Sequence, residues 1–379
     1  MNYNEKIVAE GLTFDDVLLI PRYSEITPDM AVLKTRLTKH IDINTPLMSA
    51  AMDTVTEHQM AIQMALHGGV GGVHKNMKIE DQAEEIAKVK AILIDDAQYP
   101  LANKDKQGRL LVGASIGITA DKEIRVKAVL DAGADFLVLD SAHGHSKNVV
   151  SALKSLKAAF PQAEIIAGNV ATYEGAKCLM EAGADAVKVG MGPGSICTTR
   201  VISGMGVPQI TAVMEAEKAK QEYDCPIIAD GGIQHSGDIV KAIAAGADTV
   251  MLGAIFGACE AAPGGIVVVG KKVLKSYRGM GSIGAMEKAH GSADRYFQTG
   301  HQKLVPEGVE ALVPCSGKVG DVIFTLLGGL RSGMGYEGCR DIPSLQKEAM
   351  FRKITSASLK ESHPHDVTLS REAPNYQCQ

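Results

Sequence analysis

Short apolar runs alternate with helical patterns from residue 46 to residue 253, and this alternation constrains the fold more than any other feature. The apolar runs cover residues 46–50, 69–74, 111–115, 136–140, 164–168, 186–189, 226–230 and 249–253. The helical patterns between them cover 57–67, 79–90, 123–131, 149–159, 173–181, 213–221 and 236–245. Strands that are apolar along their whole length are typical of a parallel sheet buried on both faces. Eight such strands predict an α/β fold, a closed (β/α)8 TIM barrel, with a doubly wound sheet as the alternative.

An internal repeat supports this prediction. The tetrapeptide AGAD occurs at 132–135, 182–185 and 245–248, each time where a helical pattern ends and an apolar run follows. Glycine in this position is expected to end the helix in the left-handed conformation, and the aspartate to begin the strand.

Composition excludes several classes of protein. The chain of 379 residues has a net charge of −5 and no basic run, so we expect no nucleic acid partner. No apolar stretch reaches the roughly 18 residues that a membrane span requires, and the first residues do not form a signal peptide. The seven cysteines show no paired spacing, which argues against a disulfide framework and a zinc site and favours the cytoplasm.

Four segments lie outside the strand–helix rhythm. Residues 1–45 are read as a strand or arm that closes the bottom of the barrel, and residues 91–109 as a short polar linker. Residues 257–340 show no further strand–helix unit and are interpreted as loops and a mobile insertion, with a flap region at 271–310. The polar tail, 360–379, is expected to extend outward or onto a neighbouring subunit.

A glycine-rich stretch, 188–206, follows the sixth apolar run and contains one thiol, Cys197. Glycines after a buried strand let the backbone turn sharply and approach a ligand, and a thiol there is a candidate nucleophile. The alternative is a buried structural cysteine. The polar, glycine-rich ends of the other runs favour the functional interpretation, because barrels of this type carry their chemistry at the carboxyl ends of the strands.

Other strand ends suggest a nucleotide. The glycines at 231, 232 and 253 match the place where such barrels bind phosphate, although two tight turns would give the same pattern. Asp140 is a candidate acceptor for ribose hydroxyls or, equally, a helix cap. Arg295 and Tyr296 in the insertion would, by themselves, be interpreted as a surface contact.

Taken in order, the motifs resemble those of the inosine-5′-monophosphate dehydrogenase family. They are GLTFDDVLLIP, AAMDTVTE, LDSAHGHS, GNVAT, GPGSICTTR, ADGGI, YRGMGS, DRYFQ and ESHPHDV, and they span essentially the whole chain. The resemblance implies oxidation of inosine monophosphate (IMP) to xanthosine monophosphate (XMP) in guanine nucleotide biosynthesis. Cys197 would attack C2 of the purine, hydride would leave to NAD+, and the thioimidate would then be hydrolysed. Arg295, Tyr296 and Thr199 would activate the water.

The resemblance also implies binding residues. For IMP these are Ser195, Asp230, Gly232, Gly253, Tyr277, Gly279, Met280, Gly281 and Glu307, with Asn169 and Met52 nearby. For NAD+ they are Asp140, Ser141, Ala142, Gly190, Met191 and Gly192. Potassium would be held by carbonyl oxygens of Gly192, Gly194 and Cys197, and by Glu361, Ser362 and His363 of an adjacent subunit. A site shared between subunits implies an oligomer, in this family a tetramer.

Two departures from the family pattern stand out. Most members carry a pair of CBS regulatory domains where this chain has only residues 91–109, so the pair is either naturally absent or has been removed. Position 50, often serine in the family, is alanine here, which removes one hydroxyl near IMP. Two other functions stay open: guanosine-5′-monophosphate (GMP) reductase, which shares the cysteine loop, and a catalytically silent nucleotide-binding barrel.

Overall fold

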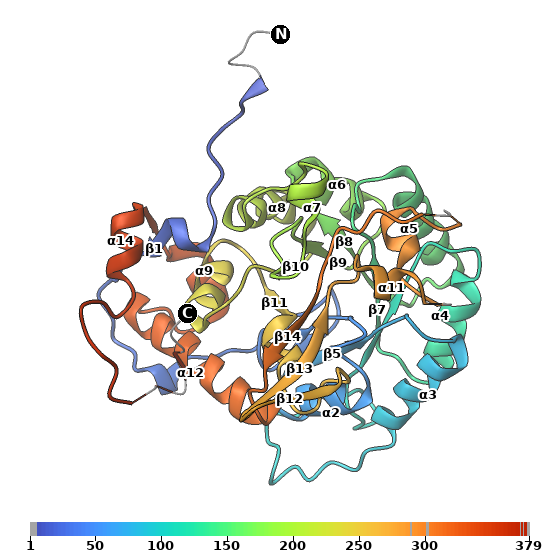
Figure 1. The fold of residues 1–379 in the computed structure, drawn as a ribbon, viewed down its shortest axis with the longest axis horizontal. Coiled ribbons are helices and arrows are strands. Elements are labelled where there is room, and N and C mark those ends of the chain that lie inside the picture. Colours follow the sequence, from blue (N-terminus) through green and yellow to red (C-terminus); the bar gives the residue numbers. More distant parts are fainter. Residues whose placement is uncertain (1–5, 289, 301–302, 372, 374, 377–379) are drawn as a thin grey trace.

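The computed structural model describes residues 6–288, 290–300, 303–371, 373, 375 and 376. Eight parallel strands form a closed barrel in the order β10-β11-β4-β5-β6-β7-β8-β9 (Figure 1). Their bounds are β4 Leu47–Ser49, β5 Val70–Val73, β6 Gly113–Ile116, β7 Phe136–Asp140, β8 Glu164–Val170, β9 Ala186–Val189, β10 Ile227–Asp230 and β11 Thr249–Leu252. The predicted barrel is confirmed and the doubly wound sheet is excluded, because β11 pairs with both β10 and β4 and leaves no open edge.

Helices surround the barrel at the places that the sequence patterns predict. They are α2 His58–Leu66, α3 Ile79–Lys90, α4 Lys122–Asp131, α5 Lys147–Ala159, α6 Tyr173–Glu181, α8 Gln209–Tyr223 and α9 Ser236–Ala244, with the short α7 Thr199–Ile202 and α10 Ala254–Gly257 after two of the strands. Each of the longer helices buries one apolar stripe; in α6, for example, Ala176, Leu179 and Met180 face the core. Among the described residues, no helix combines the length and the apolar character that crossing a membrane demands.

The prediction for residues 257–340 is wrong for one long helix. Helix α12, Val319–Glu337, packs against α9 and completes the outer ring of the barrel. Its glycines lower intrinsic helix propensity, which conceals it in the sequence. They are required by tertiary packing: a Cβ at Gly329 would lie 2.1 Å from Ser236 Oγ, and one at Gly333 would lie 2.7 Å from the Val240 side chain.

The rest of that region holds a small antiparallel sheet beside the barrel. Its strands are β12 Ile266–Val269, β13 Lys272–Arg278 and β14 Glu310–Pro314. Between β13 and β14 lie α11 Ile283–Met286 and the 3-10 helix η3 Ala293–Tyr296. We refer to residues 279–309, which join β13 to β14, as the flap; Figure 1 shows it in orange, running from β13 towards the side of the barrel near β7.

The opening segment divides between the two ends of the barrel, which differs from the expectation. The hairpin of β2 Thr35–Arg36 and β3 Asp42–Ile43 closes the bottom, where Leu37 and Ile43 pack against the barrel interior. The preceding elements are η1 Phe14–Asp16, β1 Val17–Leu19 and η2 Pro28–Met30, and the last ones are α13 Ile342–Glu348, β15 Phe351–Lys353 and α14 Ser356–Glu361. Strand β1 pairs with β15, and the Phe14 ring lies at Gly232 on the opposite end of the barrel. The segment therefore closes the bottom only with its second half.

The connection from α3 to β6 consists of residues 91–112 alone, which form a loop with several turns and one isolated bridge between Lys104 and Leu110 (Figure 1). The CBS pair is absent from the chain.

The AGAD repeat forms the same polar clamp three times at the bottom of the barrel. Its glycines have the expected left-handed conformation, with φ of +102°, +99° and +119°. In the second copy, Asp185 accepts a hydrogen bond from the Ile165 amide at 2.8 Å and pairs with Lys157 Nζ at 2.8 Å. Asp135 and Asp248 make the same pair of contacts, with Lys90 and Lys220. Each clamp thus joins the start of one strand to the start of the preceding strand, and also to the helix that leads into that preceding strand.

Substitution Asp185→Ala is expected to lower the free energy of unfolding by about 3 kcal/mol, because it leaves Lys157 without its partner and the Ile165 amide buried without an acceptor. Urea unfolding measures this loss. The matched control is Asp131→Ala, which removes an exposed partner of Lys127 and should change stability by less than about 0.5 kcal/mol. Equal urea midpoints for the two variants would contradict the clamp.

Candidate active site

A cavity of about 1030 Å³ opens at the carboxyl ends of the barrel strands. Most of the residues selected from the sequence line it, namely Met52, Asp140, Asn169, Gly190, Gly192, Gly194, Ser195, Cys197, Asp230, Gly232, Gly253, Tyr277, Gly279, Met280, Arg295, Tyr296 and Glu307. They come from six barrel strand ends, from β13, which carries Tyr277, and from the flap. The structure therefore gathers into one site residues that lie up to 255 positions apart, from Met52 to Glu307.

Cys197 stands on the loop between β9 and α7, partly exposed to this cavity. Its Sγ donates to Thr199 Oγ1 at 3.2 Å, and Thr199 is the first residue of α7. The backbone on both sides of the cysteine is fixed by the end of the flap: the Thr198 amide donates to Glu307 O at 2.9 Å, and the Val309 amide donates to Ile196 O at 3.0 Å. The thiol is thus held in a defined position with an oxygen beside it.

Glycines let three backbone segments meet at this point. The Gly279 amide donates to Val309 O at 2.9 Å, and the Glu307 amide donates to Gly281 O at 3.0 Å. A Cβ at Gly281 would lie 2.7 Å from the Tyr296 ring, and one at Gly279 would lie 3.1 Å from Ile196 O. The YRGMGS motif is therefore glycine-rich because the flap and the cysteine loop approach it closely.

The flap places Arg295 and Tyr296 over the cavity. Arg295 Nη1 forms an ion pair with Asp140 at the end of β7, and the Ala142 amide donates to the carbonyl of Arg295 at 3.1 Å. Both charged side chains are largely buried. Burial raises the pKa of the Tyr296 hydroxyl, an effect that the neighbouring Arg295 opposes. The pair that sequence reasoning alone would interpret as a surface contact is thus part of the site.

A buried lysine joins the strand ends to one another. Lys188 Nζ, on β9, donates to Asp140 Oδ1 at 3.0 Å, to Asp230 Oδ2 at 2.8 Å and to Asn169 Oδ1. Its side chain is 2% exposed. Lys188 was not among the residues selected from the sequence, because it lies within an apolar run. A lone cation in a buried strand is the signal that could have identified it.

The opposite wall of the cavity provides hydroxyl groups and open backbone. Burial raises the pKa of the Tyr277 hydroxyl, and the Ser195 side chain opposes that shift. A Cβ at Gly253 would lie 2.7 Å from that hydroxyl oxygen. Gly231 and Gly232 have φ of +94° and +82°, so the backbone after β10 turns in a way that favours glycine. The structure thus brings Gly231, Gly232 and Gly253 to the cavity, and their role in binding phosphate stays a prediction.

The structure does not bring every selected residue to the cavity. Ser141 and Ala142 lie behind Asp140, where the Ser141 amide donates to Gly168 O at 3.0 Å. Met191 lies on the outer side of the cysteine loop and pairs with Val207. Glu361, Ser362 and His363 are exposed at the end of α14, and among the described residues the ring contacts of His363 are with His235 and Tyr376. Their assignment to an ion site in a neighbouring subunit stays a prediction.

Within the described part of the chain, one group of histidine, cysteine and carboxylate side chains has metal-ligand spacing: His40, Glu164 and Asp185. It lies at the bottom of the barrel, and Asp185 is already paired with Lys157. Among the described residues, no group of this kind lies at the cavity on the other end of the barrel.

Comparison with known proteins gives one consistent result. A family model described as "IMP dehydrogenase / GMP reductase domain" matches residues 11–365. The inosine-5′-monophosphate dehydrogenase of Aquifex aeolicus is 44% identical, over 98% of this chain and 99% of the relative. The enzymes of the same name from Halalkalibacterium halodurans and Chlorobaculum tepidum are 41% and 40% identical over similar shares. The Aquifex alignment has 484 positions, more than the 379 residues of this chain, so that relative has residues with no counterpart here.

Substitution Lys188→Met is expected to lower the free energy of unfolding by about 3–5 kcal/mol, because it leaves the carboxylates of Asp140 and Asp230 without their shared buried cation. The control is Lys177→Met on α6, whose partner Glu222 is half exposed and whose loss should cost less than about 1 kcal/mol. Urea unfolding compares the two variants. A Lys188→Met protein as stable as the control would show that the cation does not hold the strand ends together.

Proposed function

Because the chain belongs to the IMP dehydrogenase / GMP reductase family, we propose that it catalyses the NAD-dependent oxidation of IMP to XMP, a step towards guanine nucleotides. The observation that carries the proposal is the position of Cys197, whose thiol faces the cavity beside Thr199 while the flap holds Arg295 and Tyr296 above it. A nucleophile and a separate, protected water-activating group suit a reaction in two stages.

In the first stage the Cys197 thiolate adds to C2 of the purine, forming a C–S bond and a tetrahedral carbon. The hydride then leaves C2 with its electron pair, and a thioimidate remains on the sulfur. NAD+ supplies the acceptor for that hydride. The Ser195 and Tyr277 hydroxyls and the open backbone at Gly232 and Gly253 are suited to hold the ribose phosphate of IMP, with Asp230 accepting from ribose hydroxyls.

The residues expected to hold the dinucleotide fit this role on the condition that Arg295 has moved away from Asp140. Asp140 Oδ1 accepts a hydrogen bond from Lys188 Nζ, and Asp140 Oδ2 forms the ion pair with Arg295. A ribose hydroxyl of NAD+ that binds this carboxylate would therefore compete with Arg295 for it. We infer that Arg295 and the dinucleotide take turns at Asp140, so the flap closes after the reduced dinucleotide has left.

In the second stage water attacks C2 of the thioimidate, the C–S bond breaks, and XMP leaves with the thiol restored. Closure of the flap brings Arg295 and Tyr296 to this carbon, where Thr199 already stands beside Cys197. A guanidinium is a poor base in water because its pKa is high. The buried ion pair with Asp140 and the adjacent Tyr296 hydroxyl provide a route for the proton, with Glu307 near Tyr296 as a further acceptor.

Potassium is the second expected cofactor. A hard cation prefers oxygen ligands. Gly194 O accepts a hydrogen bond from the Cys197 amide at 3.0 Å, whereas the carbonyls of Gly192 and Cys197 accept none from the described residues and are free to hold an ion. The ion would stabilise the loop that carries the nucleophile.

We also propose that the enzyme is a homotetramer and acts in the cytoplasm. Strand β12 exposes Ile266 and Val268 on one of its faces by 63% and 67%, and apolar surface of this kind is what subunit contacts cover. The six cysteines in the described residues are free thiols, which is consistent with a reducing compartment.

GMP reductase is the alternative within the family, and a silent nucleotide-binding barrel is the alternative outside it. A reductase has no need of a hydrolytic flap, so the Arg295–Asp140 contact favours the dehydrogenase. The names of relatives that match over 98–99% of this chain favour it as well.

The proposal is tested by mixing the enzyme with IMP and NAD+. We expect NADH formation and, in quenched samples, an IMP-derived mass adduct on Cys197. Substitution Cys197→Ala should abolish both, since the nucleophile is lost. Consumption of GMP and NADPH without NADH from IMP would establish the reductase, and binding of IMP without any adduct would establish the silent barrel.

Substitution Arg295→Ala separates the two stages. We expect a normal first burst of NADH, a steady-state rate lower by about 10²-fold or more, and accumulation of the Cys197 adduct, because only hydrolysis requires the guanidinium. Rapid-quench kinetics measure both rates. Equal losses in the burst and in the steady-state rate would contradict the assignment of Arg295 to the flap's hydrolytic role.

A further inference from the structure

The residue that precedes Arg295 is seated in a polar pocket of its own. Asp294 pairs with Lys75, which follows β5, and the side chains are only 7% and 10% exposed. The pocket lies at the ends of β5 and β6, outside the contacts described for the substrates. Sequence analysis assigned no role to either residue.

The pocket matches the carboxylate closely. A Cβ at Gly117, directly after β6, would lie 2.3 Å from Asp294 Oδ2, so any side chain there would push the carboxylate out. That oxygen is buried and has no hydrogen-bond partner. The other oxygen, Asp294 Oδ1, accepts a hydrogen bond from the Lys75 ammonium. Burial lowers the pKa of Lys75, and Asp294 opposes that shift.

A second cation stands behind the first. Arg125 of α4 is buried and donates to Gln82 Oε1 at 2.8 Å and to Met77 O at 3.2 Å. Gln82 in turn donates to Val73 O and Ser115 O, so this cation is fixed to β5 and β6. Arg125 and Asp294 attract each other: burial lowers the pKa of Arg125, and the charge of Asp294 opposes that shift. When the flap closes, one carboxylate therefore enters a region that holds two cations.

The anchor acts directly on the catalytic arginine, because the two residues are consecutive in η3. The start of η3 is held as well: the Ser292 side chain is fully buried and donates to Met280 O. With Asp294 fixed, the Arg295 carbonyl reaches the Ala142 amide and its guanidinium reaches Asp140.

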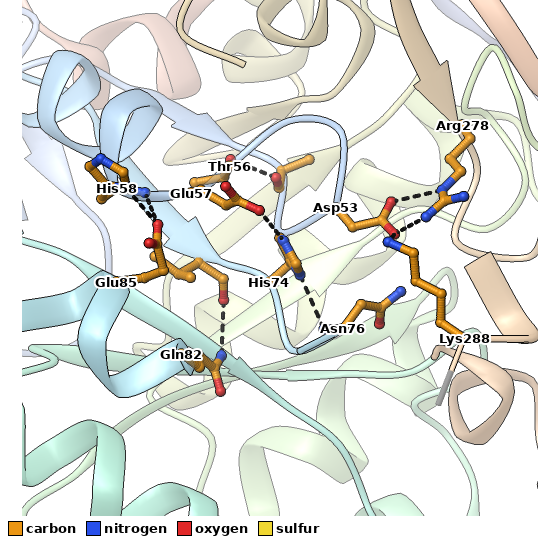
Figure 2. A network of polar contacts seen from close by, with 12 residues as sticks. Asp53, Thr56, Glu57, His58, His74, Asn76, Gln82, Glu85, Arg278 and Lys288 are labelled. Atoms are coloured by element: carbon orange, nitrogen blue, oxygen red, sulfur yellow. Dashed lines mark hydrogen bonds and ion pairs between the residues drawn. The ribbon is translucent and has the colours of Figure 1, made fainter. Parts of the chain in front are cut away.

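The base of the flap has a separate anchor. Figure 2 shows Arg278, at the end of β13, and Lys288, within the flap, converging on Asp53. Burial would raise the pKa of Asp53, but Arg278 and Lys288 hold it below its ordinary value. Because Arg278 belongs to the strand from which the flap starts, the contact with Asp53 fixes the base of the flap. The tip of the flap, at Asp294 and Arg295, is held by the Lys75 pocket instead.

We propose that the Lys75–Asp294 ion pair is a latch that holds the flap closed and positions Arg295 for the hydrolytic stage. The proposal rests on the function proposed above. When the flap opens, Asp294 returns to water and the buried Lys75 loses its ion-pair partner, while the half-exposed side of the cluster keeps Asp121, which acts on both Lys75 and Arg125. The pair therefore favours the closed state. Neither residue touches the reacting atoms; both act through Arg295.

The first test uses the variants Asp294→Asn and Lys75→Gln. We expect a burst of NADH equal to that of the unchanged enzyme, a steady-state rate lower by about tenfold or more, and accumulation of the Cys197 adduct, since a weaker latch leaves the flap open more often. The control is Lys127→Gln on α4, whose partner Asp131 is exposed and which should change nothing. Unaltered steady-state rates in both latch variants would overturn the proposal.

The double variant sharpens this test. If Lys75 and Asp294 act as one pair, Lys75→Gln with Asp294→Asn should be no slower than the worse single variant. Losses that multiply would show two independent effects and would overturn the latch.

A second readout does not depend on the reaction. Trypsin cleaves after Lys288 and Arg295 only when the flap is accessible, so in the protein without ligands both latch variants should be cut in the flap about fivefold faster or more. The Lys127→Gln control should be cut at the unchanged rate. Equal cleavage of latch variants and control would contradict the proposal even if the enzyme proved to have another activity. Faster cleavage in an enzyme that never forms NADH from IMP would refute the proposed function and leave the latch standing.

Discussion

One buried ammonium group, that of Lys188, determines how the ends of four barrel strands are arranged. It lies on β9 and uses its three donors on Asp140 of β7, Asn169 of β8 and Asp230 of β10. A charge so deeply buried is stable only when its partners surround it completely. The same partners are residues that we propose to bind the dinucleotide and IMP. The positions of these carboxylates relative to one another therefore depend on a single cation, and the ion pair of Arg295 with Asp140 extends this network to the flap.

The flap is joined to the barrel by contacts that differ in strength and in place. Backbone hydrogen bonds at 279–281 and 307–309 hold its two ends against the cysteine loop, and Asp53 holds its base. Its tip, at Asp294 and Arg295, is held by two buried ion pairs and by one backbone hydrogen bond, from the Ala142 amide to the Arg295 carbonyl. The several backbone hydrogen bonds at the two ends fix a geometry, whereas the charged side chains at the tip regain hydration when they leave their pockets. A flap anchored in this way can stay attached to the nucleophile and still expose the cavity.

Much of the fold could be predicted because the signals are local. Strands buried on both faces must be apolar throughout, and the AGAD repeat marks three helix ends, so the barrel and its helices follow from the sequence. Helix α12 could not be predicted, since Gly329 and Gly333 look like helix breakers until the contact with α9 explains them. The arm at 1–45 was misplaced for a similar reason: apolar residues show that a segment is buried, not against which end of the barrel.

For the site, the sequence by itself determined the reacting groups: a thiol in a glycine-rich loop, carboxylates at strand ends and, through the resemblance to a family, an arginine–tyrosine pair. Chemistry of this kind depends on residue type, which the sequence states directly. Only the tertiary structure decided the roles of Lys188, Lys75 and Asp294. Each is an ordinary charged residue in its local sequence, and it acquires its role from burial next to an opposite charge far away in the chain. Burial and partnership are properties of the folded chain, and no local pattern of residues encodes them.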